Sequence, residues 1–175
     1  MTLGKPPRLE RVFQKYDPPL FFVTLCTAKR RPILATERVH RAVMEYGEHA
    51  AKTGIALGRY VIMPDHMHLF VCGGQDFDLG VWIRGLKRVV AAAVTAADPV
   101  EVAVPLPPET AAATTSSAER RAPVWQRGFF DHLIRSSESY AQKWEYVREN
   151  PVRAGLAASA VEWPFQGEIA VIHRV

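Results

Sequence analysis

The pattern of hydrophobic and polar residues in the first part of the chain predicts three strands and a helix. Residues 21–27 (FFVTLCT) are rich in aromatic and β-branched side chains and predict a buried strand. After Thr36, apolar residues recur at helical spacing, which predicts a helix that ends near Gly54. Residues 55–63 and 66–71 then predict two strands joined by a Pro-Asp turn, and so a hairpin.

The second part of the chain predicts two more helices and one more strand. Residues 77–97 predict an amphipathic helix, and residues 126–134 predict a short strand. Ser136 can cap a final helix that runs to about Asn150. Between them, residues 98–123 are rich in Pro, Ala, Thr and Ser and cannot bury enough surface to fold alone, so we expect a mobile surface insertion.

This order of elements predicts an α+β fold with an antiparallel sheet. A strand, a helix, a hairpin, a helix, a strand and a helix follow one another, which is the ferredoxin-like or split βαβ arrangement with helices on one face of the sheet. The length of 175 residues suits a single domain spanning 1–175. Residues 1–18 are expected to form a basic N-terminal arm.

Composition and charge favour an acidic partner in solution. The formal net charge is +4 and the sequence pI is about 9.3, which puts nucleic acid first among partners. No apolar stretch resembles a signal peptide or a membrane span, so a soluble, intracellular protein is expected, with no membrane contact. The candidate DNA-binding cations are Arg84, Lys87, Arg88 and Arg127.

His66 and His68 form the first candidate site. Side chains alternate along a strand, so these two imidazoles share one face while Met67 points to the other. Two imidazoles on one face can clamp a metal ion, although two exposed histidines on the wet side of a hairpin would give the same spacing. The next position on this face is Phe70, which argues against nucleotidyl hydrolases of the HxHxH type.

The last predicted helix carries the second candidate, Tyr146. At 100° per residue, Tyr140, Trp144 and Val147 lie on one stripe, which is the face that the helix would bury. Tyr146 lies roughly 120° from the middle of that stripe and is free to reach a site. An exposed tyrosine with no chemical role is the ordinary alternative.

Asn150 lies one helical turn after Tyr146, on the same side of the helix. Side chains four residues apart can converge on one point, so the amide could join a site with the tyrosine. Asn followed by Pro151 is also a common helix start, and Asn150 could cap a short helix over residues 151–156. Helix geometry leaves both interpretations open.

Three separated motifs resemble a known family. They are YVIMPDHMHL at 60–69, WQRGFFDH at 125–132 and YVRENPVRAGL at 146–156, and WPF at 163–165 matches the usual end of the family's domain. Together they resemble the single-tyrosine HUH transposases, and most closely the branch called REP-associated tyrosine transposases. The resemblance runs from about residue 21 to residue 165. The Pro/Ala/Thr-rich insertion departs from it, because many relatives are more compact.

The resemblance implies a metal-dependent single-stranded DNA endonuclease and strand transferase of the HUH type. It implies Mg²⁺ or Mn²⁺ as cofactor, a 5′-phosphotyrosine intermediate, and single-stranded or hairpin DNA, such as REP-type palindromes, as partner. The protein would act in the bacterial cytoplasm at the nucleoid, as a monomer or homodimer. The implied site residues are the nucleophile Tyr146, the metal ligands His66, His68 and Asn150, and Asp65, His132 and Arg135 in second-shell or DNA-positioning roles.

Two other functions remain open from the sequence. A non-catalytic DNA- or RNA-binding module could use Phe and basic residues on the same sheet as a stacking surface. A zinc hydrolase could use His66, His68 and His132, although the chain has no HExxH or CxxC pattern.

Overall fold

The computed structural model describes residues 18–74, 76–96 and 122–172. Most of the predicted arm and insertion, 1–18 and 98–123, lie outside the described residues. The strands are β1 (Leu20–Cys26), β2 (Ala56–Ile62), β3 (His66–Cys72), β4 (Phe130–Ile134) and β5 (Gln166–Glu168). The α-helices are α1 (Glu37–Ala51), α2 (Leu79–Thr95), α4 (Ser137–Arg148) and α5 (Asn150–Arg153), and two short 3₁₀ helices are η1 (Ala28–Arg30) and η3 (Ala160–Glu162).

The five strands form one antiparallel sheet in the order β4-β1-β3-β2-β5. This topology confirms the predicted α+β class and the split βαβ arrangement, and it makes β3 the central strand. The predicted strand at 126–134 is shorter than expected. Gly128 has a positive φ of 72°, and Trp125 forms an isolated bridge to Thr27, so regular pairing begins only at Phe130.

Each of the longer helices begins with a side-chain cap. Thr36, Asp78 and Ser136 accept hydrogen bonds from the backbone N–H groups of the third residue of α1, α2 and α4. The cap at Ser136 was predicted from the sequence. These caps start each helix at the point where the preceding loop leaves the sheet.

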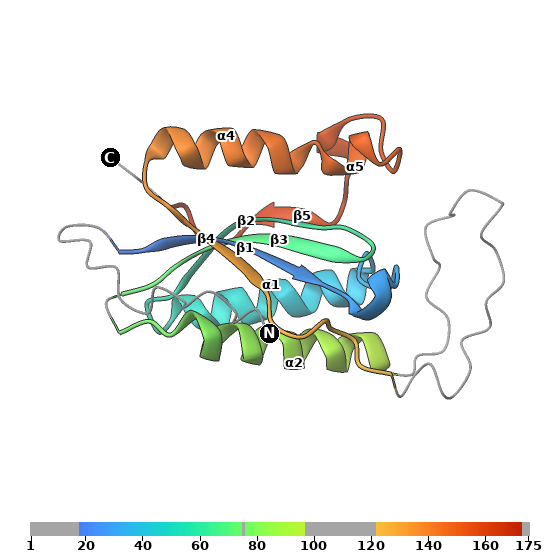
Figure 1. Cartoon of the computed structure of the whole chain (residues 1–175), viewed down its shortest axis with the longest axis horizontal. Coiled ribbons are helices and arrows are strands. Elements are labelled where there is room, and N and C mark those ends of the chain that lie inside the picture. The colour runs from blue at the N-terminus through green and yellow to red at the C-terminus, as the bar shows by residue number, and fades with distance from the viewer. Residues whose placement is uncertain (1–17, 75, 97–121, 173–175) are drawn as a thin grey trace, which may run out of the picture.

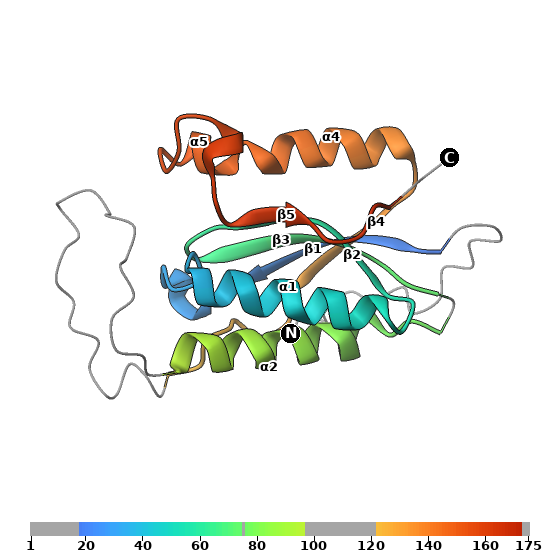
Figure 2. The same cartoon turned by 180° about the vertical axis from the view of Figure 1, so that it is seen from behind.

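The helices form two layers, one on each face of the sheet (Figures 1 and 2). α1 and α2 cover one face and pack on each other, with the Tyr46 hydroxyl donating to the Trp82 carbonyl over 2.9 Å. α4 and α5 lie over the opposite face. The structure differs here from the prediction of helices on one face only.

The physical reason for the second layer is a small apolar cluster on the α4 side of the sheet. Leu20, Phe70 and Ile134 come from three different strands and have 0% exposed surface, because Tyr140 of α4 packs on them. Burial of such side chains stabilises the fold by about 1.5–3 kcal/mol each. No helix among the described residues is long and apolar enough to cross a membrane.

Candidate functional site

His66 and His68 lie side by side on the central strand, on the face beneath α4. Their ring centroids are 4.9 Å apart and the rings are nearly perpendicular, at 82°. Met67 and Leu69 alternate with them, have 0% exposed surface and belong to the main hydrophobic core. The predicted division of this strand into a histidine face and a core face is therefore confirmed.

His68 is held in place by β1, its neighbour in the sheet. The Thr24 hydroxyl lies 2.9 Å from His68 Nδ1, and the Phe22 ring stacks on the imidazole at 5.3 Å between centroids. Burial lowers the pKa of His68 to about 3, and the nearby charges of His66, Arg30 and Lys143 act in the same direction. The His68 imidazole is therefore neutral at physiological pH, which is the form that binds metals.

His66 is held by the carboxylate that precedes it. Asp65 Oδ1 lies 2.6 Å from His66 Nδ1, and Asp65 Oδ2 forms an ion pair with Arg30 Nε at 2.7 Å. The turn that carries Asp65 is fixed from below, because the backbone N–H of buried Thr27 donates to the Asp65 carbonyl over 2.9 Å. Asp65 thus has a geometry that suits the predicted second-shell role.

Arg30 reaches Asp65 from an unusual backbone conformation. Lys29 and Arg30 have φ values of 57° and 55°, in the left-handed region that non-glycine residues rarely adopt. Such strain costs about 1–3 kcal/mol per residue and gathers at functional sites. Sequence analysis missed Arg30 as a site residue, because nothing in the sequence reveals a left-handed turn formed without glycine.

The histidine pair suits a metal ion by its donor chemistry. Both Nδ1 atoms are engaged, by the Thr24 hydroxyl and the Asp65 carboxylate, which leaves both Nε2 atoms for a ligand. Metal-binding histidines characteristically use their second ring nitrogen for such a hydrogen bond. Thr24 is a further residue that the sequence did not reveal, since its place opposite His68 follows from strand register.

The structure does not bring together the three histidines of the zinc hydrolase hypothesis. Among the described residues, no group of three or more His, Cys, Asp or Glu side chains could hold a metal. His132 lies on β4 opposite Phe22 of β1, so one whole strand separates it from His68.

Helix α4 has the predicted orientation over the sheet. Tyr140 and Val147 are buried, with 8% and 1% of their surface exposed, whereas Tyr146 is 65% exposed. The guanidinium of Arg59 on β2 lies over the rings of Tyr140 and Trp144, at 5.5 and 5.4 Å. These contacts fix the rotation of the helix and leave Tyr146 facing solvent.

Arg153 joins Tyr146 to Asn150. Its guanidinium lies over the Tyr146 ring at 4.2 Å, and it donates to the Tyr146 carbonyl and to Asn150 Oδ1. Asn150 is the first residue of α5 and forms no side-chain cap, so the capping alternative does not hold. Within the described residues, no hydrogen bond or ion pair joins Tyr146 or Asn150 to His66 or His68.

Lys143 shows where α4 passes over the histidines. Its Nζ lies 5.1 Å from the centroid of the Phe22 ring, and Phe22 stacks on His68. Lys143 precedes Tyr146 by three residues, so both lie on the same side of the helix. Sequence analysis missed Lys143 and Arg153, although their spacing of three residues from Tyr146 and Asn150 could have indicated them.

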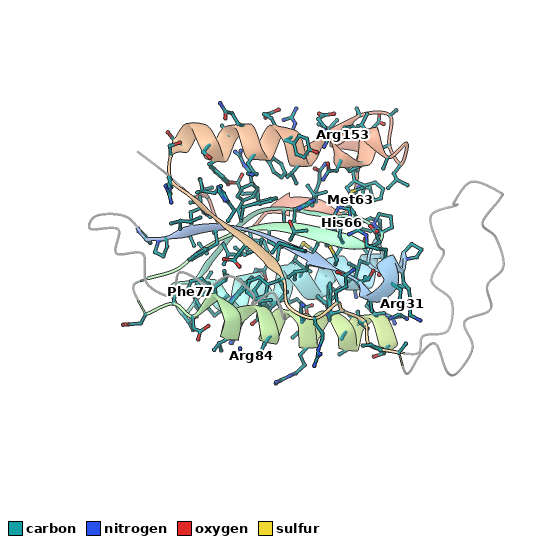
Figure 3. The ribbon with its side chains drawn as sticks, viewed as in Figure 1. Arg31, Met63, His66, Phe77, Arg84 and Arg153 are labelled. Carbon is teal, nitrogen blue, oxygen red and sulfur yellow. The ribbon has the colours of Figure 1, made fainter. Side chains whose placement is uncertain are left out.

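The predicted DNA-binding residues are scattered. Arg84 and Arg88 are exposed on α2, which lies across the sheet from α5 and its Arg153 (Figure 3). Lys87 is committed within the protein, because Nζ donates to the carbonyls of Gln126 and Gly128 over 3.1 and 2.5 Å. The structure does not bring this group together with the histidine pair.

Three other predicted residues lie near β4. Arg127, His132 and Arg135 are all exposed, before, within and after the strand. His132 shares the histidine face of the sheet, since its register partner Phe22 stacks on His68. A DNA-positioning role for these residues stays a prediction.

Comparisons with known proteins agree with this architecture. Residues 21–102 match the family described as "Transposase IS200 like". A Haemophilus influenzae protein assigned to the REP-associated tyrosine transposases is 24% identical over 148 residues, which cover 83% of this chain and 77% of that protein. The REP-associated tyrosine transposase of Escherichia coli is 36% identical over 42 residues, covering 24% of this chain and 26% of that protein.

A solved structure has the same fold. A REP-associated tyrosine transposase bound to a REP hairpin superposes with a TM-score of 0.61 at 18% identity, covering 94% of this chain and 98% of that one. The resemblance predicted from the three motifs is confirmed: the chain is similar in sequence to REP-associated tyrosine transposases and shares the fold of one of them.

Proposed function

We propose that this chain cuts and rejoins single-stranded DNA, with Tyr146 as a covalent nucleophile and the His66–His68 pair as a metal clamp. One observation carries the proposal most: on the face beneath α4, the helix that exposes Tyr146, both histidines use Nδ1 for a neighbour, and no hydrogen bond to Nε2 occurs among the described residues. The match to the IS200-like transposases supports the same reaction class.

In this proposal His66 and His68 hold a divalent ion, and Asn150 supplies an amide oxygen. Mg²⁺ or Mn²⁺ bound there would polarise the scissile phosphate and stabilise the charge that develops on it. Asn150 Oδ1 already accepts from Arg153, but a carbonyl oxygen has two lone pairs and can take a second partner. Asp65 and Thr24 keep the two imidazoles in the orientation that exposes Nε2.

The tyrosine does the covalent chemistry. The Tyr146 oxygen attacks phosphorus and loses its proton to solvent, so a new P–O bond forms as the bond from phosphorus to the 3′ oxygen breaks. The leaving oxygen takes up a proton and becomes a 3′-OH, while the 5′ phosphate stays on the enzyme as a phosphotyrosine. Attack by another 3′-OH reverses the step and rejoins DNA without a nucleotide cofactor.

Arg153 is a positioning residue for this reaction. Its contact with the Tyr146 ring and its hydrogen bond to Asn150 couple the nucleophile to the proposed third ligand. A guanidinium stacked on a phenol ring contributes about 0.5–1 kcal/mol at an exposed site, enough to bias the side-chain orientation without locking it. Tyr146 can therefore turn toward a bound strand.

The proposed substrate is a single strand or the base of a hairpin. Only an unpaired backbone can bend into a site on a sheet beneath a helix, and the excess of positive charge favours a polyanion. The solved relative in complex with a REP hairpin supports hairpin DNA as the form to test first.

The decisive experiment compares two tyrosines of the same helix. Wild-type protein and a single-stranded oligonucleotide from the flanks of its own gene, with Mn²⁺, should give a covalent adduct on a denaturing gel. Tyr146→Phe should lower adduct formation more than about 10³-fold. Because Tyr146 is exposed, stability should change by less than about 0.5 kcal/mol.

Tyr140→Phe is the matched control, since Tyr140 is buried away from solvent on the same helix, and it should keep the adduct. An adduct that survives in Tyr146→Phe would refute the assignment. Hairpin binding by a wild-type protein that forms no adduct would favour the non-catalytic binding module.

A further inference from the structure

One exposed aromatic side chain is left without a role by the proposed reaction. Among the described residues, the exposed large hydrophobic side chains include only two aromatic ones, Tyr146 at 65% and Phe130 at 72%. A single exposed hydrophobic residue is ordinary on a protein surface, so exposure alone means little. The position of Phe130 in the sheet makes it informative.

Strand register puts Phe130 in the same row as His68. Phe130 of β4 pairs with Thr24 of β1, and Thr24 pairs with His68 of β3, so all three side chains lie on one face. Two strand spacings separate Phe130 from His68, or about 10 Å. The Thr24 hydroxyl between them is bound to the His68 ring.

Helix α4 covers only the end of β4 that is far from Phe130. At the far end of the strand, Ile134 has 0% exposed surface and packs with Tyr140 of α4, whereas His132 and Phe130 on the same face are exposed. β4 is also an edge strand of the sheet. On this face β4 is therefore open at His132 and Phe130, and β1 alone separates them from the half-buried histidine pair.

Two side chains next to these exposed residues, Phe22 and Lys143, suit the binding of a nucleotide chain. The Phe22 ring forms the floor beside His68, and the Lys143 ammonium lies over it at 5.1 Å. Lys143 forms no ion pair with a carboxylate among the described residues, so its charge is available to a phosphate. An aromatic ring beside an uncompensated cation is the usual pattern of single-strand binding surfaces.

We propose that Phe130 is a stacking platform for one unpaired nucleobase of the DNA strand whose phosphate lies at His66 and His68, with Lys143, over the neighbouring Phe22 ring, binding the backbone. The proposal rests on the proposed function, because it takes the histidine pair as the place of the scissile phosphate. Because only about 10 Å separates Phe130 from His68, the stacked base lies close to the cleavage position along the strand. The surface would thus help to select where the strand is cut.

The test uses the full-length protein and a hairpin oligonucleotide with a single-stranded flank, in which 2-aminopurine replaces each flank base in turn. One flank position should show strong fluorescence quenching on binding to wild-type protein. Phe130→Ala should remove quenching at that position and raise Kd about 5- to 100-fold, since one lost base stack has this effect. Phe130→Trp should keep both the quenching and the wild-type Kd, because a larger ring stacks at least as well.

Val81→Ala is the matched control, because Val81 is an exposed apolar residue of α2, on the other side of the sheet. It should leave Kd and quenching unchanged. Unchanged quenching and Kd in Phe130→Ala would overturn the proposal. So would a wild-type dimer that becomes monomeric in Phe130→Ala, since a second copy of the chain would then be what covers this ring.

Adduct formation, measured in the same samples, separates this inference from the proposed function. A wild-type adduct without any effect of Phe130→Ala on quenching means that the stacking site is wrong and the chemistry stands. Quenching that depends on Phe130, in a wild-type protein that forms no adduct, means that the stacking site is right and the proposed chemistry is wrong.

Discussion

The two faces of the central strand β3 are built for different purposes. Toward α1 and α2, Met67, Leu69 and Val71 have no exposed surface and join a continuous apolar core. Toward α4, His66 and His68 each bind a polar neighbour through Nδ1. The buried residues of β3 thus keep its backbone rigid, while the alternating histidines present their ring nitrogens on the opposite face. A rigid strand can in this way hold metal-binding side chains close to the required geometry.

The α4 face is itself divided along the strand. Phe70 packs under Tyr140 with the ring centroids 4.8 Å apart, while the histidine end carries polar and exposed groups. α4 is anchored at the Phe70 end and exposes Tyr146 toward its other end. The apolar anchor at Phe70 and Tyr140 thus holds α4 on the sheet and leaves Tyr146 exposed.

The largest expected effect is a loss of stability from a substitution on the core face of β3. Leu69→Ala should lower the free energy of unfolding by about 2–5 kcal/mol, because it removes buried methyl groups and leaves a cavity in a packed core. Urea unfolding followed by circular dichroism measures the loss. Phe130→Ala, at an exposed position of the other face, is the control and should cost less than about 1 kcal/mol. Equal losses in the two variants would contradict the division between the faces.

The buried positions could be predicted from the sequence because burial within one strand or helix follows a local spacing rule. Alternation along β3 and helical spacing in α4 identified the buried positions Met67, Tyr140 and Val147, and the structure agrees. β5 was missed, since its three residues, Gln166, Gly167 and Glu168, have no hydrophobic pattern and pair with β2 through the backbone. The second helix layer was missed because it depends on apolar residues from three strands meeting on one face.

The candidate site was predictable only in part, for a similar reason. The histidines and Tyr146 stand in motifs, whereas Thr24 and Arg30 enter through strand register and a left-handed turn. Neither register nor such a turn has a signature in local sequence. The sequence therefore names the candidate residues His66, His68 and Tyr146, and the fold adds the residues that contact the histidines.

A medium effect is expected from the residue that orients His68. Thr24→Val keeps the size of the side chain but removes the hydrogen bond to His68 Nδ1. Loss of such a partner should lower the affinity for Mn²⁺ about 10- to 100-fold. Isothermal titration calorimetry measures the change, and Thr24→Ser, which keeps the hydroxyl, should restore affinity.

The control for this prediction is His68→Ala, which removes the proposed ligand itself and should lose more affinity than Thr24→Val. If Thr24→Val binds Mn²⁺ as wild type does, the hydroxyl does not orient the ring. If His68→Ala also binds as wild type does, the metal clamp itself is refuted. Thr24→Val therefore tests the orientation of the ring, and His68→Ala tests metal binding itself.

The smallest expected effect comes from a histidine on the core side, His40 of α1. Its Nε2 lies 2.8 Å from the hydroxyl of Tyr60, a residue with 1% exposed surface. Burial lowers the pKa of His40, and the charge of Glu37 only partly opposes this. The same burial raises the pKa of Tyr60 to about 12, so this pair stays neutral across the physiological range.

The lowered pKa of His40 makes the free energy of unfolding depend on pH. The unfolded chain binds a proton at His40 with a pKa near 6.5, whereas the folded chain binds it only at lower pH. Stability is therefore fully present above about pH 6.5 and falls as the pH drops below it. His40→Gln should flatten this fall in urea unfolding at pH 7.5, 6.5 and 5.5, without abolishing it, because the folded pKa of His68 is also lowered.

His49→Gln, an exposed position of the same helix, is the control and should follow the wild-type curve. A His40→Gln curve parallel to wild type would mean that the core side tolerates the charged imidazole. The two faces would then differ both in packing and in their demand for neutral histidines, since burial favours neutral His68 on the α4 side. A flattened curve would instead show that the core side requires a neutral imidazole at His40, as the lowered pKa of His40 indicates.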